Sequence, residues 1–394
     1  MSNDSLVPIC KPGLPDAHAL HGYLVELDQC RVYTNHGALC RRLRKRLAAL
    51  LGVGEQCIAL TSSGTSALVV AIIAAAGRAG PDRPLCLLPA YSFVATAAAA
   101  LQCGYQPYFL DVGKGKGALA PDKVFRHPQL ARTGLVVPAS PYGRQIDFGA
   151  WKGFTRVTNV PVVIDAAAGF DLLASEIDLT QPTPPLAISL HATKTLSTGE
   201  GGIVVADTPV AERALRASNF GFLNSRASIG ASTNAKMSEY HAAVGLAECD
   251  DWSQKRQGFI DVAEQYLTCA DEVGLRDRFC ATTAYATSCV LFYSLDGSEA
   301  AQVEEALNKN GVETRRWYGN GIHRQPYFRE FGADETPNSD QLTESVLGLP
   351  MSVDLPADTI ARIVDIIATA IRRQREFMAY SAEAAGDAWR DGVE

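Results

Sequence analysis

The sequence predicts an α/β protein whose mostly parallel sheet is covered by helices on both faces. Between about residues 56 and 207, short apolar runs alternate with helix-like segments, an order typical of parallel sheets. Several of these runs are apolar at consecutive positions, as expected of strands that are buried on both faces. The expected strands are 57–63, 85–89, 108–112, 135–140, 162–167, 187–190 and 202–207.

Helical patterns flank this block. Residues 37–52 have a helical period with a basic face, and residues 237–267 have the pattern of one long helix. The C-terminal part changes character, which indicates a smaller α+β domain. Its elements are expected within 288–295, 298–311, 312–319 and 357–374. We therefore expect a large domain over 1–250, whose N-terminal segment is free to pack on the small domain, and a small domain over 251–394.

Composition limits the function. The chain has 394 residues, a net charge of −7 and 20% charged residues, so we expect neither nucleic acid nor a membrane as a partner. The N-terminus lacks a basic region followed by an apolar one, and the longest apolar stretch is too short to span a bilayer. Ten cysteines without C-x-x-C pairs predict reduced thiols and no metal site. These features predict a cytoplasmic, soluble protein.

A polar loop between two expected strands carries a single lysine. The stretch SLHATKTLSTGEGGIVV begins at Ser189 and places Lys194 before a glycine-rich turn. Taken alone, it fits a solvated hairpin. A lysine amine can also form a Schiff base with an aldehyde, and pyridoxal phosphate (PLP) chemistry needs such a lysine together with a carboxylate for the pyridine nitrogen.

The carboxylate candidate is Asp165, in VVIDAAAGFD. Ligands of open α/β sheets bind beyond the carboxyl ends of strands, where this residue is expected. A carboxylate among apolar neighbours is costly unless it meets a cation. An aspartate that caps the following segment is an equally simple reading of this residue alone.

A phosphate site is predicted in TSSGTSAL, where a strand ends at Ser63-Gly64-Thr65 and a helix begins. Helix N-termini offer unpaired N–H groups to anions, and glycine permits close approach. An ordinary N-cap explains the same residues. In PAYSFVAT, Tyr91 and Phe93 follow another strand, and one of these rings can stack on a flat cofactor or belong to the core.

Together these segments resemble the DegT/StrS family of sugar aminotransferases, which belong to the fold type I superfamily of PLP enzymes. The resemblance covers most of the chain, and the motifs follow the family's order. They are TSSGTSAL, PAYSFVATAAAA, YFLDV, PYGRQID, VVIDAAAGFD, SLHATKTLSTGEGG, NAKMSEYHAAVGLAE, HRQPYF and LGLPMS. The block that contains Lys194 is the most specific of them.

The resemblance implies PLP as the cofactor and assigns its ligands. Lys194 matches the Schiff-base lysine, and Asp165 matches the partner of the pyridinium nitrogen. Gly64, Thr65 and Ser189 match phosphate contacts.

Further assignments follow from the same resemblance. Phe93 matches the ring that stacks on the cofactor. Tyr91 is the less favoured choice for that role and is expected to contact the substrate. Asn234 is similar to an asparagine that reaches the phosphate from a neighbouring subunit, which implies a homodimer with shared active sites. The chain also departs from the family pattern at Ile164, Ala168 and Ser232, and these departures weaken any transfer of substrate specificity.

The activity implied by the resemblance is a ping-pong transfer of an amino group from L-glutamate or glutamine to a nucleotide-diphosphate-linked keto-deoxysugar. The stretch 313–328 places Arg315, Arg316 and His323 near aromatic residues, a combination suited to a diphosphate and a sugar. A solvated basic edge is the alternative for either arginine. A keto-cyclitol substrate and a non-catalytic, regulatory PLP-binding role are the competing functions. Lys194 argues against the family's dehydratases, which have histidine at this position.

Overall fold

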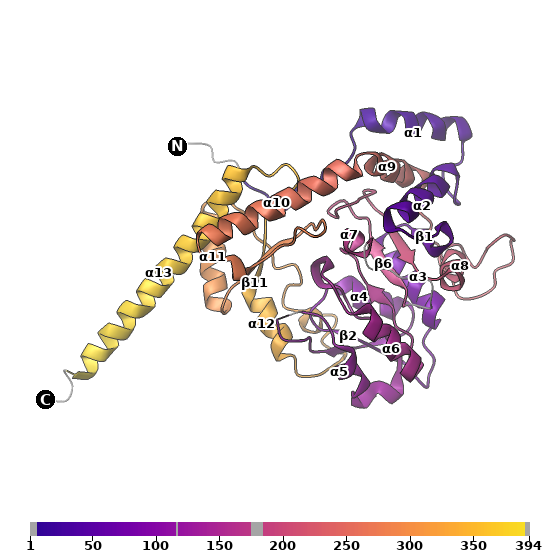
Figure 1. Cartoon of the computed structure of the whole chain (residues 1–394). Coiled ribbons are helices and arrows are strands. Elements are labelled where there is room, and N and C mark those ends of the chain that lie inside the picture. Colours follow the sequence, from indigo (N-terminus) through magenta and orange to yellow (C-terminus); the bar gives the residue numbers. More distant parts are fainter. Residues whose placement is uncertain (1–5, 116, 175–183, 391–394) are drawn as a thin grey trace.

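The computed structural model describes residues 6–115, 117–174 and 184–390, with side chains through residue 373. A large sheet lies among helices at one side of the molecule, and the C-terminal elements form a second layer beside it (Figure 1). The large sheet contains β1 Ile58–Thr61, β2 Leu85–Pro89, β3 Gln106–Leu110, β4 Thr133–Val136, β5 Ile164–Asp165, β6 Leu186–Ser189, β7 Gly202–Val205 and the short β10 Gly332–Ala333. All seven strands expected in this region are therefore confirmed.

The sheet has the strand order β10-β3-β2-β4-β5-β6-β7-β1. Two four-stranded ladders, β10-β3-β2-β4 and β1-β7-β6-β5, meet through parallel bridges from Val136 to Val162 and from Ala139 to Asp165. Neighbours are parallel except at β7, which is antiparallel to β1 and β6. A single loop from Leu190 to Gly201 joins β6 to β7 at one edge of the sheet, so β7 must run backwards.

The consecutive apolar residues of the strands serve two separate cores. Ile58, Leu60 and Ile164 pack into one core with α2 Ala38–Leu51 and α9 Glu239–Asp250. Ala59 and Val163 face the other core, with α3 Gly64–Ala76, α4 Val94–Gln102 and α8 Thr208–Ala217. Because successive side chains of a strand point to opposite faces, a strand covered on both sides is apolar throughout. The fold class predicted from the sequence is thus correct.

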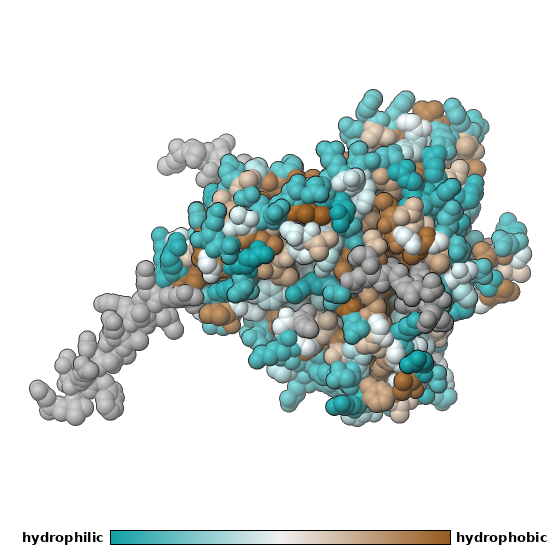
Figure 2. Space-filling model, viewed as in Figure 1, coloured by the Kyte–Doolittle hydropathy of each residue, from teal (hydrophilic) through white to brown (hydrophobic). Residues whose placement is uncertain are grey.

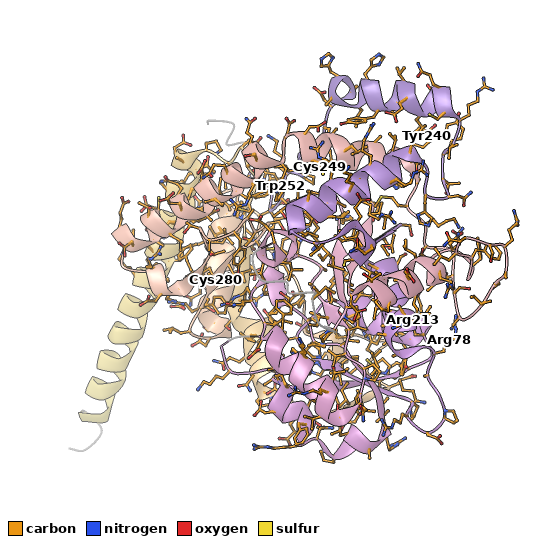
Figure 3. The ribbon with its side chains drawn as sticks, turned by 45° about the vertical axis from the view of Figure 1, so that its right-hand side comes forward. Arg78, Arg213, Tyr240, Cys249, Trp252 and Cys280 are labelled. Carbon is orange, nitrogen blue, oxygen red and sulfur yellow. The ribbon has the colours of Figure 1, made fainter. Side chains whose placement is uncertain are left out.

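The long helix expected over 237–267 is in fact two helices. α9 ends at Asp250, and α10 Trp252–Glu272 begins one residue later. Asp251 between them has φ −99° and ψ 4°, and aspartate favours helix ends over helix interiors. Cys249 and Trp252 lie at this junction (Figure 3). α10 then runs from the large sheet towards α13 (Figure 1). We propose that the two domains divide at this break.

The C-terminal part contains an antiparallel sheet in the order β11-β9-β8, formed by Val346–Leu349, Val290–Tyr293 and Phe279–Cys280. The helices α11 Gly297–Lys309, α12 Pro337–Ser345 and α13 Ala357–Arg390 accompany it. The run 312–319 forms only isolated bridges, from Val312 to Val7 and from Arg315 to Gly348. The N-terminal segment therefore packs on these C-terminal residues.

The remaining elements are shorter helices and one helix near the N-terminus. They are α1 Ala17–Cys30, α5 Pro121–Phe125, α6 Phe148–Thr158, α7 Phe170–Leu173 and the short 3-10 helices η1 Glu55–Cys57, η2 Pro128–Arg132, η3 Pro141–Gly143, η4 Arg276–Arg278 and η5 Ile322–Arg324. All ten cysteines are free thiols. Within the described ranges, no helix combines the length and apolar character needed to cross a membrane. Figure 2 shows a face dominated by hydrophilic residues, with hydrophobic ones scattered among them.

Candidate active site

The end of β1 and the end of β6 approach closely where a phosphate site was expected. A Cβ atom on Gly64 would lie 2.6 Å from Cβ of Ser189 and 2.8 Å from its Oγ, so only glycine fits there without displacement. Ser63 caps α3 by accepting a hydrogen bond of 3.0 Å from the N–H of Ser66. The first turn of α3, which includes Thr65, thus faces Ser189 with its positive dipole end.

Asp165 lies at the carboxyl end of β5 with 6% of its surface exposed. Its Oδ2 accepts a hydrogen bond of 2.6 Å from the Thr96 hydroxyl, and its Oδ1 accepts one of 3.1 Å from the N–H of Ala167. Burial raises the pKa of this carboxyl, while the two hydrogen bonds and the charge of Lys194 act in the opposite direction. The structure therefore brings Lys194 within electrostatic reach of Asp165, as the sequence predicted.

The loop that carries Lys194 is held by its own hydrogen bonds. The N–H of Lys194 donates to the carbonyl of His191 over 2.8 Å, and the N–H of Thr198 donates to that of Leu190 over 2.8 Å. The N–H of Ser197 donates to the buried Glu248 of α9, which also pairs with Lys255 of α10 at 2.6 Å. The lysine is half-buried on a loop anchored to both helices, which is not the arrangement of a solvated hairpin.

Three tyrosines form an aromatic cluster near Asp165. Tyr91 is buried, and its hydroxyl lies 2.7 Å from that of Tyr142. The ring of Tyr142 stacks on Tyr318 at 4.6 Å, and the charge of Asp165 acts on Tyr318. Phe93 stands at the N-cap of α4 with 57% of its surface exposed. The structure thus places Tyr91 in a tyrosine cluster beside the site, with Phe93 at its outer edge.

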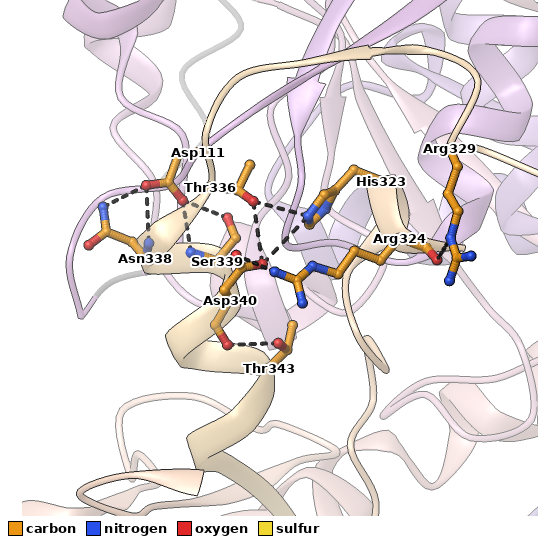
Figure 4. A network of polar contacts seen from close by, with 9 residues as sticks. All are labelled: Asp111, His323, Arg324, Arg329, Thr336, Asn338, Ser339, Asp340 and Thr343. Carbon is orange, nitrogen blue, oxygen red and sulfur yellow. Dashed lines mark hydrogen bonds and ion pairs between the residues drawn. The ribbon is translucent and has the colours of Figure 1, made fainter. Parts of the chain in front are cut away.

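The residues expected to meet the sugar lie apart from one another. Nε2 of His323 lies 3.0 Å from the hydroxyl of Thr336 and 3.5 Å from Asp340, in the polar network of Figure 4. Arg316 pairs with Glu304 at 3.1 Å and donates to the carbonyls of Thr343 and Glu344. These contacts engage all three nitrogens of the Arg316 guanidinium within the protomer.

Arg315 and Asn234 are both exposed. Arg315 lies over the Trp317 ring at 5.2 Å. Asn234 accepts a hydrogen bond of 2.6 Å from Lys236 at the base of the loop that projects after α8 (Figure 1). Both side chains are therefore open to molecules outside the protomer.

The residues gathered here fit PLP. Gly64 brings the N-terminus of α3 close to the Ser189 hydroxyl, and backbone N–H groups beside a hydroxyl suit a phosphate group. The buried Asp165 has two hydrogen-bond donors and a nearby ammonium group, which suits a protonated ring nitrogen as a further partner. Lys194 supplies the amine that an aldehyde requires.

A family model decides the assignment of the chain. The model of the DegT/DnrJ/EryC1/StrS aminotransferase family matches residues 17–368. This chain belongs to that family. The resemblance read from the motifs is therefore confirmed, and so is the conclusion that the protein is an enzyme of the aminotransferase class.

Relatives of this DegT/DnrJ/EryC1/StrS member cover nearly its whole length. A Mycobacterium bovis protein is 29% identical over 375 residues, covering 91% of this chain and 88% of its own length. The dTDP-4-amino-4,6-dideoxy-D-glucose transaminase of Shigella dysenteriae is 27% identical, with 91% and 97% covered. The solved structure of DesI with its TDP-sugar product has a TM-score of 0.80 and 27% identity, with 97% and 96% covered. The expected fold type I architecture is thus confirmed.

Several residues of the site have no counterpart in the sequence argument. Thr96 was within a quoted motif, but its hydrogen bond to Asp165 joins segments 69 positions apart. Tyr142 and Tyr318 stack although they are 176 positions apart, and Glu248 meets Lys255 across the helix break.

Proposed function

We propose that this DegT/DnrJ/EryC1/StrS member is a PLP-dependent aminotransferase that moves an amino group from L-glutamate or glutamine to a keto-deoxysugar linked to a nucleoside diphosphate. The proposal is carried by the buried Asp165, which accepts hydrogen bonds from Thr96 and Ala167 and on which the charge of Lys194 acts, together with the close packing of Gly64 on Ser189. The printed activity of the Shigella relative and the TDP-sugar bound by DesI support the sugar nucleotide.

In this proposal the chain's residues divide the work between holding the cofactor and moving protons. The N-terminus of α3, Gly64 and Ser189 hold the phosphate, and Asp165 keeps the ring nitrogen protonated. When bound, PLP supplies an electron sink for the negative charge that develops on the α carbon. Nζ of Lys194 removes the α proton of the amino donor, and in the second half of the reaction it delivers a proton to the carbon that receives the amine.

Thr96 fits this division of work because it holds the carboxylate that must stay ionised. Its hydroxyl is fully buried and donates to Oδ2 of Asp165. A hydrogen bond to the ionised form favours that form, so Thr96 opposes the effect of burial on the carboxyl. The tyrosine cluster on the neighbouring side excludes water from the same carboxylate.

We also propose that two copies of the chain share their active sites. The loop after α8 projects from the body (Figure 1) and carries the exposed apolar residues Phe220 and Ile229. Exposed apolar side chains gathered on one projection are typical of a protein contact. Asn234 lies at the base of this loop and is exposed, where a second copy would be met.

The test is a coupled assay on the purified, PLP-loaded protein with glutamate or glutamine and a panel of nucleotide-linked keto-sugars and free keto-cyclitols. Mass spectrometry identifies any aminated product. The proposal predicts an aminated nucleotide sugar that is absent with Lys194→Ala. An aminated cyclitol without any aminated nucleotide sugar would show that the acceptor is wrong, and absence of any glutamate half-reaction would favour a non-catalytic role.

A further inference from the structure

A tight turn after β4 fixes the position of one arginine. In the 3-10 helix Pro141–Gly143, Tyr142 has φ 57° and Gly143 has φ 73°. A Cβ on Gly143 would overlap the carbonyl of Ala168, so this close approach requires glycine. The hydroxyl of Ser140 donates to the carbonyl of Arg144. These backbone contacts therefore fix the position of the Arg144 Cα atom, from which the side chain extends.

The guanidinium of Arg144 lies between the two domains without an acidic partner. It donates a hydrogen bond of 2.8 Å to the hydroxyl of Tyr293 in β9. In the part of the chain that the structure describes, no carboxylate forms an ion pair with it. Three other partly buried arginines do have one: Arg256 pairs with Asp171, Arg278 with Glu299 and Arg316 with Glu304. Arg144 thus retains donors for an anion from solution.

These donors face a small cavity. It has a volume of about 190 Å³ and is lined by Tyr142 and Arg144 on one side and by Cys280, Tyr285 and Cys289 on the other. Cys280 marks the small-domain side in Figure 3. Pockets for larger organic ligands hold about 300–1,000 Å³, so this cavity is too small for a nucleoside and suits a short chain that ends in a carboxylate.

The cavity adjoins the candidate active site. Cys289 lines it, and the adjacent residue Ser288 lines a second cavity together with Lys194. Tyr142 lines it too, and its ring stacks on the ring of Tyr318. Burial raises the pKa of Tyr318, and the negative charge of Asp165 contributes to that rise. A small molecule held by Arg144 would therefore have its other end near Lys194.

We infer that Arg144 binds a carboxylate group of the amino-acid donor in the cavity between Tyr142 and the loop 281–289. The inference rests on the proposed aminotransferase function, and it assigns one substrate contact within it. An arginine fork matches the two oxygens of a carboxylate. The Tyr293 hydroxyl accepts from one N–H group of the guanidinium and holds it in place. The small volume of the cavity favours a short carboxylate over a nucleoside diphosphate.

The test uses the full-length, PLP-loaded protein with Arg144→Gln and Arg144→Lys, and Arg78→Gln as a matched exposed control. Calorimetry measures the Kd of glutarate, a dicarboxylate that cannot donate an amine, and spectroscopy measures the apparent Kd of glutamate in the half-reaction. Loss of a charge-assisted contact predicts weakening of both by about 10- to 100-fold in Arg144→Gln. Arg144→Lys is expected to lose less, and Arg78→Gln nothing, while the KM of the sugar stays within about twofold.

An unchanged Kd for glutarate and glutamate in Arg144→Gln would overturn the inference, even if the unfolding temperature falls. An increase confined to the KM of the sugar would also overturn it. If Arg144→Gln does not fold, Arg144→Lys decides by the same two constants, because lysine keeps the charge and loses the fork. Failure of the wild-type protein to bind PLP or react with glutamate would instead refute the proposed function.

Discussion

The hydroxyl of Thr96, at the start of α4, donates a 2.6 Å hydrogen bond to Oδ2 of Asp165, at the end of β5. Both residues are buried, and Asp165 has a pKa raised by that burial. The carboxylate proposed to meet the cofactor ring is thus held by a residue from a neighbouring strand–helix unit, and this relationship provides the first test of the site.

Thr96→Val is expected to weaken PLP binding about tenfold or more, because hydrogen bonds to charged groups contribute about 1.5–3 kcal/mol. The pKa of Asp165 should rise further without the hydroxyl, so less of the carboxyl is ionised. Equilibrium titration of the cofactor by absorbance measures the effect. Thr96→Ser, which keeps the hydroxyl, is the control, and equal affinity in both variants would contradict this role.

Gly64→Ala should destabilise the protein by about 1–3 kcal/mol and weaken PLP binding, because the new Cβ would stand 2.6 Å from Cβ of Ser189. Denaturant unfolding and cofactor titration measure the two effects. Gly22→Ala in α1 is the matched control, since nothing lies within 4 Å of its Cβ. Similar results for the two substitutions would mean that the Gly64–Ser189 contact is not restrictive.

The lysine and the carboxylate were predictable because both follow strand-like runs, and the carboxyl ends of such strands meet at one edge of a sheet. The helix break at Asp251 was not predictable from the sequence, because the helical period of apolar residues continues across it. The structure shows why it exists: α9 is buried on most sides against α1 and α2, whereas α10 leaves towards α13. Contacts such as Thr96–Asp165 depend on the order of the strands in the sheet, and a local sequence pattern does not predict that order.

Arg315→Ala and Arg316→Ala should differ. Arg316 pairs with Glu304 and two carbonyls, so its loss should lower the free energy of unfolding by about 1–3 kcal/mol. Arg315 is exposed, and its loss should leave stability within about 0.5 kcal/mol while raising the KM of the sugar more than that of glutamate. Steady-state kinetics with both substrates and thermal unfolding give the comparison. Equal changes in the two KM values for Arg315→Ala would argue against a diphosphate contact.

His323 should make stability depend on pH. Burial lowers its pKa below the ordinary 6.5, against the opposing charges of Asp340 and Asp111. The unfolded chain therefore binds a proton that the folded one resists, so its contribution is fully present above about pH 6.5 and is lost as pH falls below that value. Burial also lowers the pKa of His36, so both histidines contribute to the pH dependence of wild type. The difference between wild type and His323→Gln isolates the contribution of His323.

Unfolding temperatures between pH 8 and 5 provide that difference. Wild type should lose more stability than His323→Gln as the pH drops below about 6.5. Parallel curves for the two proteins would mean that His323 titrates in the folded protein as it does in the unfolded chain.

The central claim is that Lys194 carries the cofactor beside Asp165. The most direct measurement is borohydride reduction of the PLP-loaded protein, followed by digestion and mass spectrometry of the peptides. The account predicts one pyridoxyl-labelled peptide, with the label on Lys194, and no labelling in Lys194→Ala. A label on a different lysine, or a labelled product from Lys194→Ala at the wild-type level, would contradict it.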